Sequence, residues 1–238
     1  MPRRTPPGRV QNVARAACDA FIAKGYRRTL MTDVGERLNL SHALLYQYVE
    51  GKEALLELAA RYAMDQDADL EALVPLPNPP KGQVLELVRD WLATRATFPK
   101  LRAAVERGPG GDAAEELAGV IDELYDFLEQ NRLLLLLVES LVDDYPGLTG
   151  ASVDDRKRSF KGLMAAFLAS GATLGALRPL SNPEVAAHFL VESVAWFAQH
   201  RKRDPNAAMI DDREARSSLR DLLLAAFLPA TTTTGRGR

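Results

Sequence analysis

The side chains with the clearest chemical potential lie within residues 32–53, TDVGERLNLSHALLYQYVEGKE. A helix over residues 42–49 would expose a set with no net charge at neutral pH: His42, Ala43, Leu44, Tyr46, Gln47 and Tyr48. A solvated surface helix normally displays Lys and Glu, whereas a helix in the major groove of DNA excludes acidic groups, which would repel phosphate. These residue types therefore favour nucleic-acid recognition over catalysis.

Two short helices, over residues 32–38 and 42–49, must position this set. Ser41 is a suitable N-cap for the second helix, and Asn39 tolerates the left-handed backbone of a tight turn. Lys52 begins the next helix, where a cation opposes the helix dipole, and a phosphate bound there would account for its placement. The pattern predicts a helix-turn-helix, although an ordinary corner between two helices would read the same way.

Residues 10–56 resemble the DNA-binding domain of the TetR (tetracycline-repressor) family. The resemblance rests on Ala16-Ala17, Phe21, Gly25-Tyr26, Thr29, the run Leu44-Leu45-Tyr46-Gln47-Tyr48-Val49, and Lys52-Glu53-Ala54-Leu55-Leu56. Three positions depart from the family pattern, all with mild steric consequences: Asn39 for the usual turn glycine, Gly35 for alanine, and Val49 for an aromatic residue. Gly35 costs the helix up to ~1 kcal/mol relative to alanine.

The resemblance implies roles for individual residues of this segment. Phosphate contacts carry over to Tyr46, Tyr48 and Lys52, and base or groove contacts to Thr32, His42, Leu44 and Gln47. Gln47 could bind adenine through two hydrogen bonds, His42 could reach a purine N7, and Leu44 could touch a thymine methyl group. With the cap and Ala43, the predicted DNA-binding set is Thr32, Ser41, His42, Ala43, Leu44, Tyr46, Gln47, Tyr48 and Lys52.

Composition excludes several other classes of protein. The 238 residues are 47% hydrophobic and 26% charged, as in soluble globular proteins. The single cysteine, Cys18, excludes an internal disulfide and fits a reducing cytoplasm, and we find no signal peptide or membrane span. The three histidines are far apart and no phosphate-binding glycine loop is present, so we expect no metal, no cofactor and no enzymatic activity.

Charge is distributed unevenly along the chain. Residues 1–53 carry nine Lys and Arg against five Asp and Glu, whereas the remainder carries 21 against 27. A basic N-terminal module on an acidic body is typical of a DNA-binding head, although ordinary scatter in charge could produce it. Arg3, Arg4 and Arg9 would then form either an arm that reaches DNA or a merely flexible tail.

Helical periodicity extends through the rest of the sequence, without strand alternation. We expect further helices at 10–24, 52–74, 81–98, 100–107, 112–130, 132–143, 153–170, 183–203 and 212–228. Thr29 can cap the second of the three head helices, and the prolines between 75 and 80 would form a stiff spacer. The predicted architecture is all-α: a flexible basic tail (1–9), a three-helix DNA-binding domain (10–56), a larger ligand-binding and dimerisation domain of about nine or ten helices (57–229), and a disordered tail (230–238).

The last two predicted helices are apolar over a wide arc, which a helix needs when partners lie on both sides. The resemblance implies a homodimer joined by a four-helix bundle, so the predicted interface is Val185, Phe189, Trp196, Phe197, Leu219, Leu222, Leu223 and Phe227. A plain internal core would give the same pattern. Between residues 81 and 177 the plausible ligand-lining residues are Trp91, Phe98, Tyr125, Phe127, Leu134, Met164 and Phe167, each of which could equally be core.

The sequence thus predicts a DNA-binding transcriptional regulator of the TetR type. Such a protein would bind an inverted-repeat operator as a homodimer, most often as a repressor, and a small apolar or aromatic effector would release it. The alternative is a helical small-molecule-binding or adaptor protein whose helix-turn-helix is structural only. That alternative predicts no salt-dependent binding to DNA.

Overall fold

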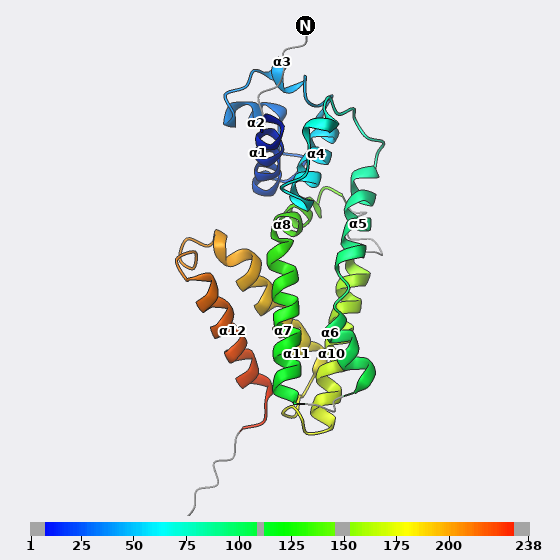
Figure 1. The fold of residues 1–238 in the computed structure, drawn as a ribbon, viewed down its shortest axis with the longest axis vertical. Coiled ribbons are helices and arrows are strands. Elements are labelled where there is room, and N and C mark those ends of the chain that lie inside the picture. Colours follow the sequence, from blue (N-terminus) through cyan, green and yellow to red (C-terminus); the bar gives the residue numbers. More distant parts are fainter. Residues whose placement is uncertain (1–7, 109–111, 146–152, 231–238) are drawn as a thin grey trace, which may run out of the picture. The chain divides into compact units, whose positions relative to one another are not determined.

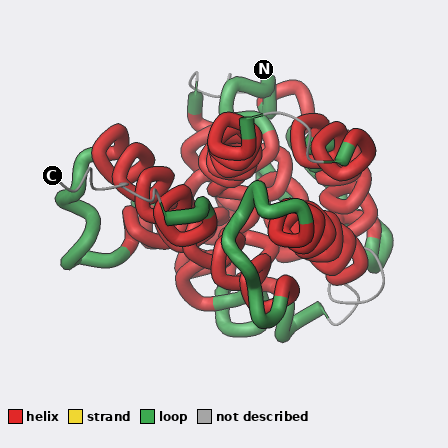
Figure 2. Tube along the Cα trace, turned by 90° about the horizontal axis from the view of Figure 1, so that it is seen from below, coloured by secondary structure: helices red, strands yellow, loops and turns green. Residues whose placement is uncertain are grey.

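The computed structural model describes residues 8–108, 112–145 and 153–230, with the side chains of 153–159 left out. Within these ranges the chain forms eleven α-helices joined by turns, and no β-strand (Figures 1 and 2). An isolated parallel bridge joins Val49 to Leu76. The predicted all-α fold is confirmed. Predicted features at Arg3, Arg4 and residues 231–238 lie outside the described residues.

The first four helices are α1 (Arg9–Lys24), α2 (Met31–Arg37), α3 (His42–Leu45) and α4 (Lys52–Met64). Apolar residues at helical spacing form the buried face of α1, and all are fully buried: Val10, Val13, Ala14, Ala17, Cys18 and Phe21. Gly25 ends α1 with a positive φ of 76°, and its N–H donates to the Phe21 carbonyl at 2.8 Å. Such a conformation favours glycine, so the expected helix end is present.

Thr29 does not cap α2, contrary to the prediction. Its side chain is buried, and its hydroxyl donates to the carbonyl oxygens of Ala20 (3.1 Å) and Gly25 (2.7 Å). Leu30 occupies the N-cap position instead, and its N–H donates to Asp33 Oδ2 at 2.7 Å. The hydroxyl of Thr29 satisfies the end of α1, because the turn brings it back over that helix.

The fourth helix ends at Met64, about ten residues earlier than predicted. The Asp65 carboxylate accepts the N–H of Asp67 at 3.0 Å, and Asp69 accepts the N–H of Glu71 at 3.2 Å. Such local side-chain bonds offer the backbone an alternative to helix. The chain then forms a short 3-10 turn, Glu71–Leu73, before the proline-containing segment.

The remaining helices follow the predicted order closely. They are α5 (Gln83–Arg95), α6 (Pro99–Arg107), α7 (Ala113–Gln130), α8 (Arg132–Leu141), α10 (Val153–Thr173), α11 (Pro183–Ala195) and α12 (Asp212–Phe227). Asn182 caps α11, because its Oδ1 accepts the N–H groups of Glu184 (2.9 Å) and Val185 (3.1 Å). Pro183 fills the first helical position, where its missing N–H costs nothing.

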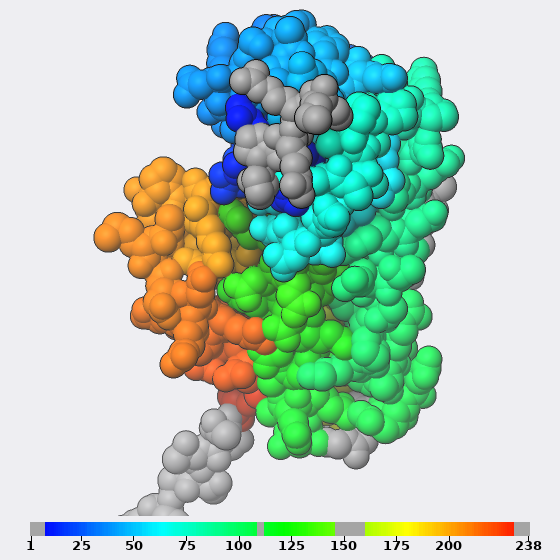
Figure 3. All heavy atoms as spheres, turned by 45° about the horizontal axis from the view of Figure 1, so that its top comes forward, coloured from blue at the N-terminus to red at the C-terminus, as the bar shows by residue number. Residues whose placement is uncertain are grey.

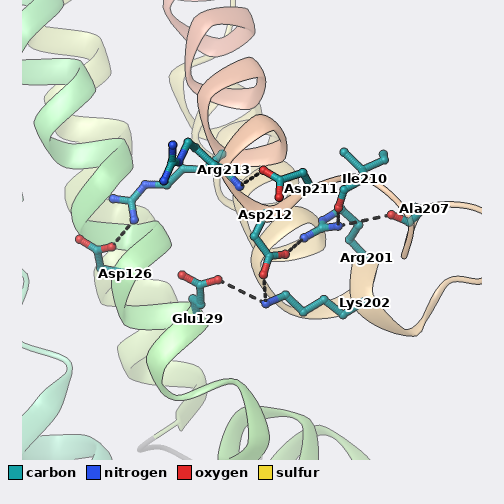
Figure 4. Close-up of polar contacts among 10 residues, drawn as sticks. Asp126, Glu129, Arg201, Lys202, Ala207, Ile210, Asp211, Asp212 and Arg213 are labelled. Atoms are coloured by element: carbon teal, nitrogen blue, oxygen red, sulfur yellow. Dashed lines mark hydrogen bonds and ion pairs between the residues drawn. The ribbon is translucent and has the colours of Figure 1, made fainter.

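The helix predicted over residues 183–203 changes character at Trp196. A π-helical turn, Trp196–His200, and a 3-10 turn, Arg201–Arg203, replace its last part. Arg201 is fully buried there, and its guanidinium donates to the carbonyl oxygens of Ala207 and Ile210 and to Asp212 (Figure 4). These hydrogen bonds hold the segment between α11 and α12 against the buried arginine.

The chain divides into two compact units. The first comprises Met1–Ala96 with Asn131–Asp154, and the second comprises Thr97–Gln130 with Asp155–Arg238. In the first unit α1 packs against α4 and α8, and in the second α7 packs against α6, α11 and α12. The boundary predicted between residues 56 and 57 falls inside α4, so that functional division does not coincide with a break between compact units and stays a prediction.

Candidate nucleic-acid interface

The turn between α2 and α3 has the tight geometry of a helix-turn-helix. Asn39 adopts a positive φ of 52°, as expected for the residue that replaces the usual glycine. The Leu40 N–H donates to the Gly35 carbonyl at 2.8 Å, and a Cβ on Gly35 would lie only 3.0 Å from the Leu40 carbonyl oxygen. Ser41 caps α3 by accepting the Leu44 N–H at 3.2 Å. Gly35 and Asn39 therefore allow the close approach of the two helices.

The exposed side chains of α3, and of the two residues that follow it, are uncharged. His42, Ala43 and Gln47 are exposed, Tyr46 is 44% exposed, and Leu44 is half-buried. The rings of His42 and Tyr46 meet edge to face at 4.8 Å between centroids. Thr32, Ser41 and these residues thus lie on the surface of one helix-turn-helix, and their predicted base and phosphate contacts stay predictions.

Tyr48 was expected on the same exposed face, but its side chain is only 5% exposed. The reason is that α3 ends at Leu45 instead of continuing to 49, and residues 46–48 form turns. The change in backbone direction rotates Tyr48 towards the interior, beside the buried Val49. The expectation of exposure was wrong, and a phosphate contact by Tyr48 stays untested.

Lys52 lies at the N-terminus of α4, where the sequence predicted a phosphate contact. Its Nζ donates to the Arg27 carbonyl at 3.2 Å and lies 4.4 Å from the centre of the Tyr26 ring. Partial burial lowers the pKa of Lys52, while Asp144 and Glu53 act in the opposite direction. The ammonium group is therefore held in a fixed place at the edge of the α1–α2 turn.

Sequence reasoning missed several exposed arginines beside this lysine. The Arg27 side chain is 73% exposed, and Arg28 and Arg37 are exposed as well. Their positions before and at the end of α2 add positive charge to the helix-turn-helix surface. The run Tyr26-Arg27-Arg28 was visible in the sequence, and adjacent cations next to a predicted recognition segment were the signal that could have found them.

A cluster of two tyrosines and one carboxylate lies next to Lys52. The Tyr26 hydroxyl donates to Glu53 Oε1 at 2.6 Å, and the Tyr145 hydroxyl lies 3.2 Å from both Glu53 oxygens. Burial, followed by the bond to Glu53, raises the pKa of Tyr26 to about 12. Burial and the neighbouring Tyr26 also raise the pKa of Tyr145. No sequence pattern pointed to this cluster, because Tyr145 is 92 residues from Glu53.

The predicted dimer residues divide into two groups in the structure. Val185, Phe189, Trp196 and Leu222 are exposed large apolar side chains, and Phe197 is half-buried. Leu219, Leu223 and Phe227 are instead buried in the core of the second unit. These three side chains already pack within one chain, where α12 contacts α7 and α11, and a contact with a second subunit stays a prediction.

The predicted ligand-lining residues are not brought together in one unit. Trp91 and Leu134 belong to the first unit, whereas Phe98, Tyr125, Phe127, Met164 and Phe167 belong to the second. Tyr125, Met164 and Phe167 are buried in the core of that unit, as Leu134 is in the first. The rings of Phe98, Phe127 and Phe160 pack together, with centroids 4.9 and 4.3 Å from Phe98. Phe98 also adopts a positive φ of 46°, an uncommon conformation for an aromatic residue.

A hollow in the second unit has a different lining. Its volume is 590 Å³, and its lining is Lys100, Ala103, Ala104, Arg107, Asp112, Glu115, Glu116 and Gly119. These residues belong to α6, α7 and the turn before α7, and none is among the predicted ligand residues. Across the described ranges no group of His, Cys, Asp and Glu could hold a metal ion. No helix of the described part is long and apolar enough to cross a membrane.

The tight turn, the uncharged α3 face and the flanking arginines are the features of a helix-turn-helix DNA-binding protein. Residues 14–59 match the family model described as bacterial regulatory proteins, tetR family. The DNA-binding segment of this chain therefore matches the TetR family of transcriptional regulators.

Comparison with solved structures supports the fold of the whole chain. A member of the TetR transcriptional regulator family from Streptomyces coelicolor A3 is 20% identical and has a TM-score of 0.53. The match covers 94% of this chain and 93% of the Streptomyces chain. The ketosteroid transcriptional regulator KstR2 of Mycobacterium tuberculosis is 17% identical, with a TM-score of 0.52, covering 94% of this chain and 97% of its own. No curated protein sequence matches the chain.

Proposed function

We propose that this protein is a repressor that binds an inverted-repeat operator as a homodimer and is released by a small apolar or aromatic effector. The observation that carries the proposal is the surface formed by α3 and the turn after it, where His42, Tyr46 and Gln47 are exposed without a carboxylate among them. Such side chains can form hydrogen bonds with base edges in the major groove, and the phosphates do not repel uncharged side chains.

Exposed arginines supply the affinity in this proposal. Arg27, Arg28 and Arg37 lie on the same unit as α3, and Lys52 is held at the start of α4. Cations that neutralise phosphates release counterions, which provides sequence-independent binding energy and makes affinity fall with salt. The uncharged α3 face would then read the bases while the surrounding cations fix its register.

A second copy of the chain is the proposed partner of α11 and α12. Val185 and Phe189 are exposed one turn apart on α11, Trp196 is exposed at the start of the π-helical turn, and Leu222 is exposed on α12. Apolar side chains spaced this way on a surface helix favour burial against another helix. A two-fold dimer would present two α3 helices to successive major grooves, which requires an inverted repeat.

The ring cluster of Phe98, Phe127 and Phe160 supports an apolar or aromatic effector. Phe98 and Phe160 are partly buried against the core of the second unit, Phe127 is half-buried, and Phe98 adopts a rarely occupied backbone conformation. Strained backbone of this kind is found preferentially at ligand-binding positions. Release from DNA requires that the effector bind more tightly to the chain conformation that does not bind the operator.

The experiment that tests the proposal is a fluorescence-anisotropy titration of a labelled mixed-sequence duplex with the full chain at several salt concentrations. A DNA-binding head predicts that the logarithm of the association constant falls linearly with the logarithm of salt concentration. Absence of binding even at the lowest salt would contradict the proposal and favour a protein whose helix-turn-helix is structural only.

A further inference from the structure

The proline-containing segment after α4 is bound to the end of the recognition segment, although the sequence suggested a mere spacer. We call residues 74–80 the proline strap. The Leu76 N–H donates to the Tyr48 carbonyl at 2.8 Å, and the Leu76 carbonyl accepts the Glu50 N–H at 3.0 Å. This pair of bonds makes a parallel bridge between Val49 and Leu76, and both side chains are buried.

Asn78 fastens the strap to the start of α4. Its N–H donates to Glu50 Oε2 at 3.1 Å, and its Oδ1 accepts the Ala54 N–H at 3.2 Å. Asn78 therefore satisfies one of the N–H groups that a helix N-terminus leaves unpaired, from outside the helix. In the space-filling view the stretch around residues 70–80 (turquoise) adjoins the helix-turn-helix surface (light blue) (Figure 3).

Gly51 makes room for this contact. A Cβ at Gly51 would lie 2.8 Å from both Oδ1 and Nδ2 of Asn78, which is closer than real Cβ atoms approach. The backbone of Gly51 is extended, with φ −177°, so a larger residue could adopt the conformation itself. A side chain at position 51 is therefore opposed mainly by Asn78.

The strap supplies tertiary contacts that α3 needs for stability. This helix has four residues, and a helix so short is not stable without tertiary contacts. In the segment between α3 and α4, residues 46–51, the backbone is hydrogen-bonded to Leu76, and the Glu50 carboxylate accepts the Asn78 N–H. The orientation of the exposed α3 face thus depends on a segment outside the family-matched residues 14–59.

We propose that Leu76 and Asn78 are positioning residues for DNA recognition, and that the strap is part of the DNA-reading unit. The inference rests on the proposed DNA-binding function and deepens it. Without the strap, a smaller fraction of the protein holds α3 in the orientation that fits the operator. The affinity for the operator falls in proportion to this binding-competent fraction. Non-specific affinity depends on phosphate neutralisation and is retained.

The test is a double-mutant cycle of Asn78→Ala and Gly51→Ala in the full chain. Asn78→Ala removes the cap on Ala54, and Gly51→Ala displaces the Asn78 side chain, so the two single changes break the same contact. Asn206→Ala, at an exposed asparagine of the loop before α12, is the matched control. Each protein is titrated against two duplexes: one that the wild-type chain has selected from a random DNA pool, and one of mixed sequence. Circular dichroism checks the folded fraction of each protein.

We expect each single variant to weaken binding to the selected duplex about fivefold, as for loss of a helix cap. Binding to the mixed-sequence duplex should change by less than about twofold. The double variant should be no weaker than the weaker single variant, because interacting residues are not additive. Two results would overturn the role of the strap. In one, the losses of affinity for the selected duplex multiply in the double variant. In the other, both single variants keep the wild-type ratio of affinities for the selected and mixed-sequence duplexes.

The same titrations separate this inference from the proposed function. A wild-type chain that prefers no duplex contradicts the proposed function, and the strap proposal with it. A wild-type preference that survives intact in Asn78→Ala and Gly51→Ala overturns the strap proposal alone. A mere loss of stability would lower both affinities together and leave their ratio unchanged, which also contradicts positioning.

Discussion

The carboxylate of Asp144 accepts a hydrogen bond of 2.8 Å from the backbone N–H of Arg27. Asp144 also lies 3.3 Å from the Arg27 Nε, and its Oδ2 would be 3.3 Å from a Cβ on Gly25. The residue just after α8 is thereby joined to the turn between α1 and α2, within the first compact unit. The neighbouring Tyr145–Glu53 hydrogen bond joins the same part of the chain to the start of α4.

Asp144→Ala should lower the free energy of unfolding by about 1–2 kcal/mol, because it removes a charged acceptor from a backbone donor. Chemical denaturation with urea measures this loss. Asp143→Ala is the control, since Asp143 is exposed and neighbours the same position. The control should stay within about 0.5 kcal/mol of wild type. Equal losses in the two variants would contradict a specific bond to Arg27.

The Tyr26–Glu53 bond predicts how stability depends on alkaline pH. In the unfolded chain tyrosine ionises near pH 10, whereas the pKa of Tyr26 is raised to about 12 by burial and by Glu53. Between these values the unfolded chain has released a proton that the folded chain keeps, so stability falls as pH rises. The contribution is complete below pH 10 and is lost through pH 12.

Tyr26→Phe should therefore lose less stability than wild type between these pH values, measured by urea unfolding at each end of the interval. Tyr46→Phe, at an exposed tyrosine, is the control and should follow the wild-type curve. Parallel curves for wild type and Tyr26→Phe would show that the Tyr26 phenol does not resist ionisation in the folded state.

The buried Arg201 predicts a large effect from a single substitution. Its guanidinium serves the carbonyl oxygens of Ala207 and Ile210 and the Asp212 carboxylate, and a hydrogen bond from Lys202 helps to hold the pKa of Asp212 below its ordinary value. Arg201→Met should cost about 2–4 kcal/mol in the free energy of unfolding, because it leaves the buried Ala207 carbonyl and the partly buried Ile210 carbonyl without this donor.

Thermal or urea unfolding of Arg201→Met, compared with Arg203→Met, checks this prediction. Arg203 is exposed two residues away, so its substitution should change the free energy of unfolding by about 0.5 kcal/mol or less. If Arg201→Met unfolded like the control, the described connection between α11 and α12 would not depend on the arginine.

Phe189→Asp should convert the protein from dimer to monomer. Phe189 is exposed on α11, and a carboxylate there would be buried without a partner in the proposed four-helix bundle. Sedimentation equilibrium measures the change in mass. Leu174→Asp, at an exposed leucine beyond α10, is the control and should remain dimeric. A monomeric wild type, or a dimeric Phe189→Asp, would rule out this surface.

Lys52→Ala should weaken binding to all duplexes alike and reduce the slope of affinity against salt by about one unit. The fixed position of Nζ beside the Arg27 carbonyl and the Tyr26 ring is consistent with a single phosphate contact. Anisotropy titrations over a salt series measure the slope, with Lys100→Ala in the second unit as control. A changed sequence preference with an unchanged slope would assign Lys52 a different role.

Local patterns in the sequence were sufficient for the first helices and their turn. The buried face of α1 and the positive φ of Asn39 follow from helical periodicity and from side-chain tolerance of the left-handed region. The end of α4 was not predictable in this way, because the bonds of Asp65 and Asp69 compete with a helix that the apolar spacing favours equally.

Tertiary contacts account for the other differences. Tyr48 was assigned to the exposed face by extending α3, but the strap pairs with its backbone through Leu76. Leu219 and Leu223 were assigned to an interface because amphipathic spacing does not tell an internal partner from a second subunit. Arg201 stands in the charged run Arg201-Lys202-Arg203, and only the fold shows that it is buried.

The most direct test of the account is selection of bound duplexes from a random DNA pool by the full chain at moderate salt, followed by sequencing. The account predicts enrichment of an inverted repeat whose half-sites are about one helical turn apart, or a multiple of that distance. A pool that shows no enrichment, from a protein that also fails to bind DNA at low salt, would contradict the assignment of α3 as a recognition helix.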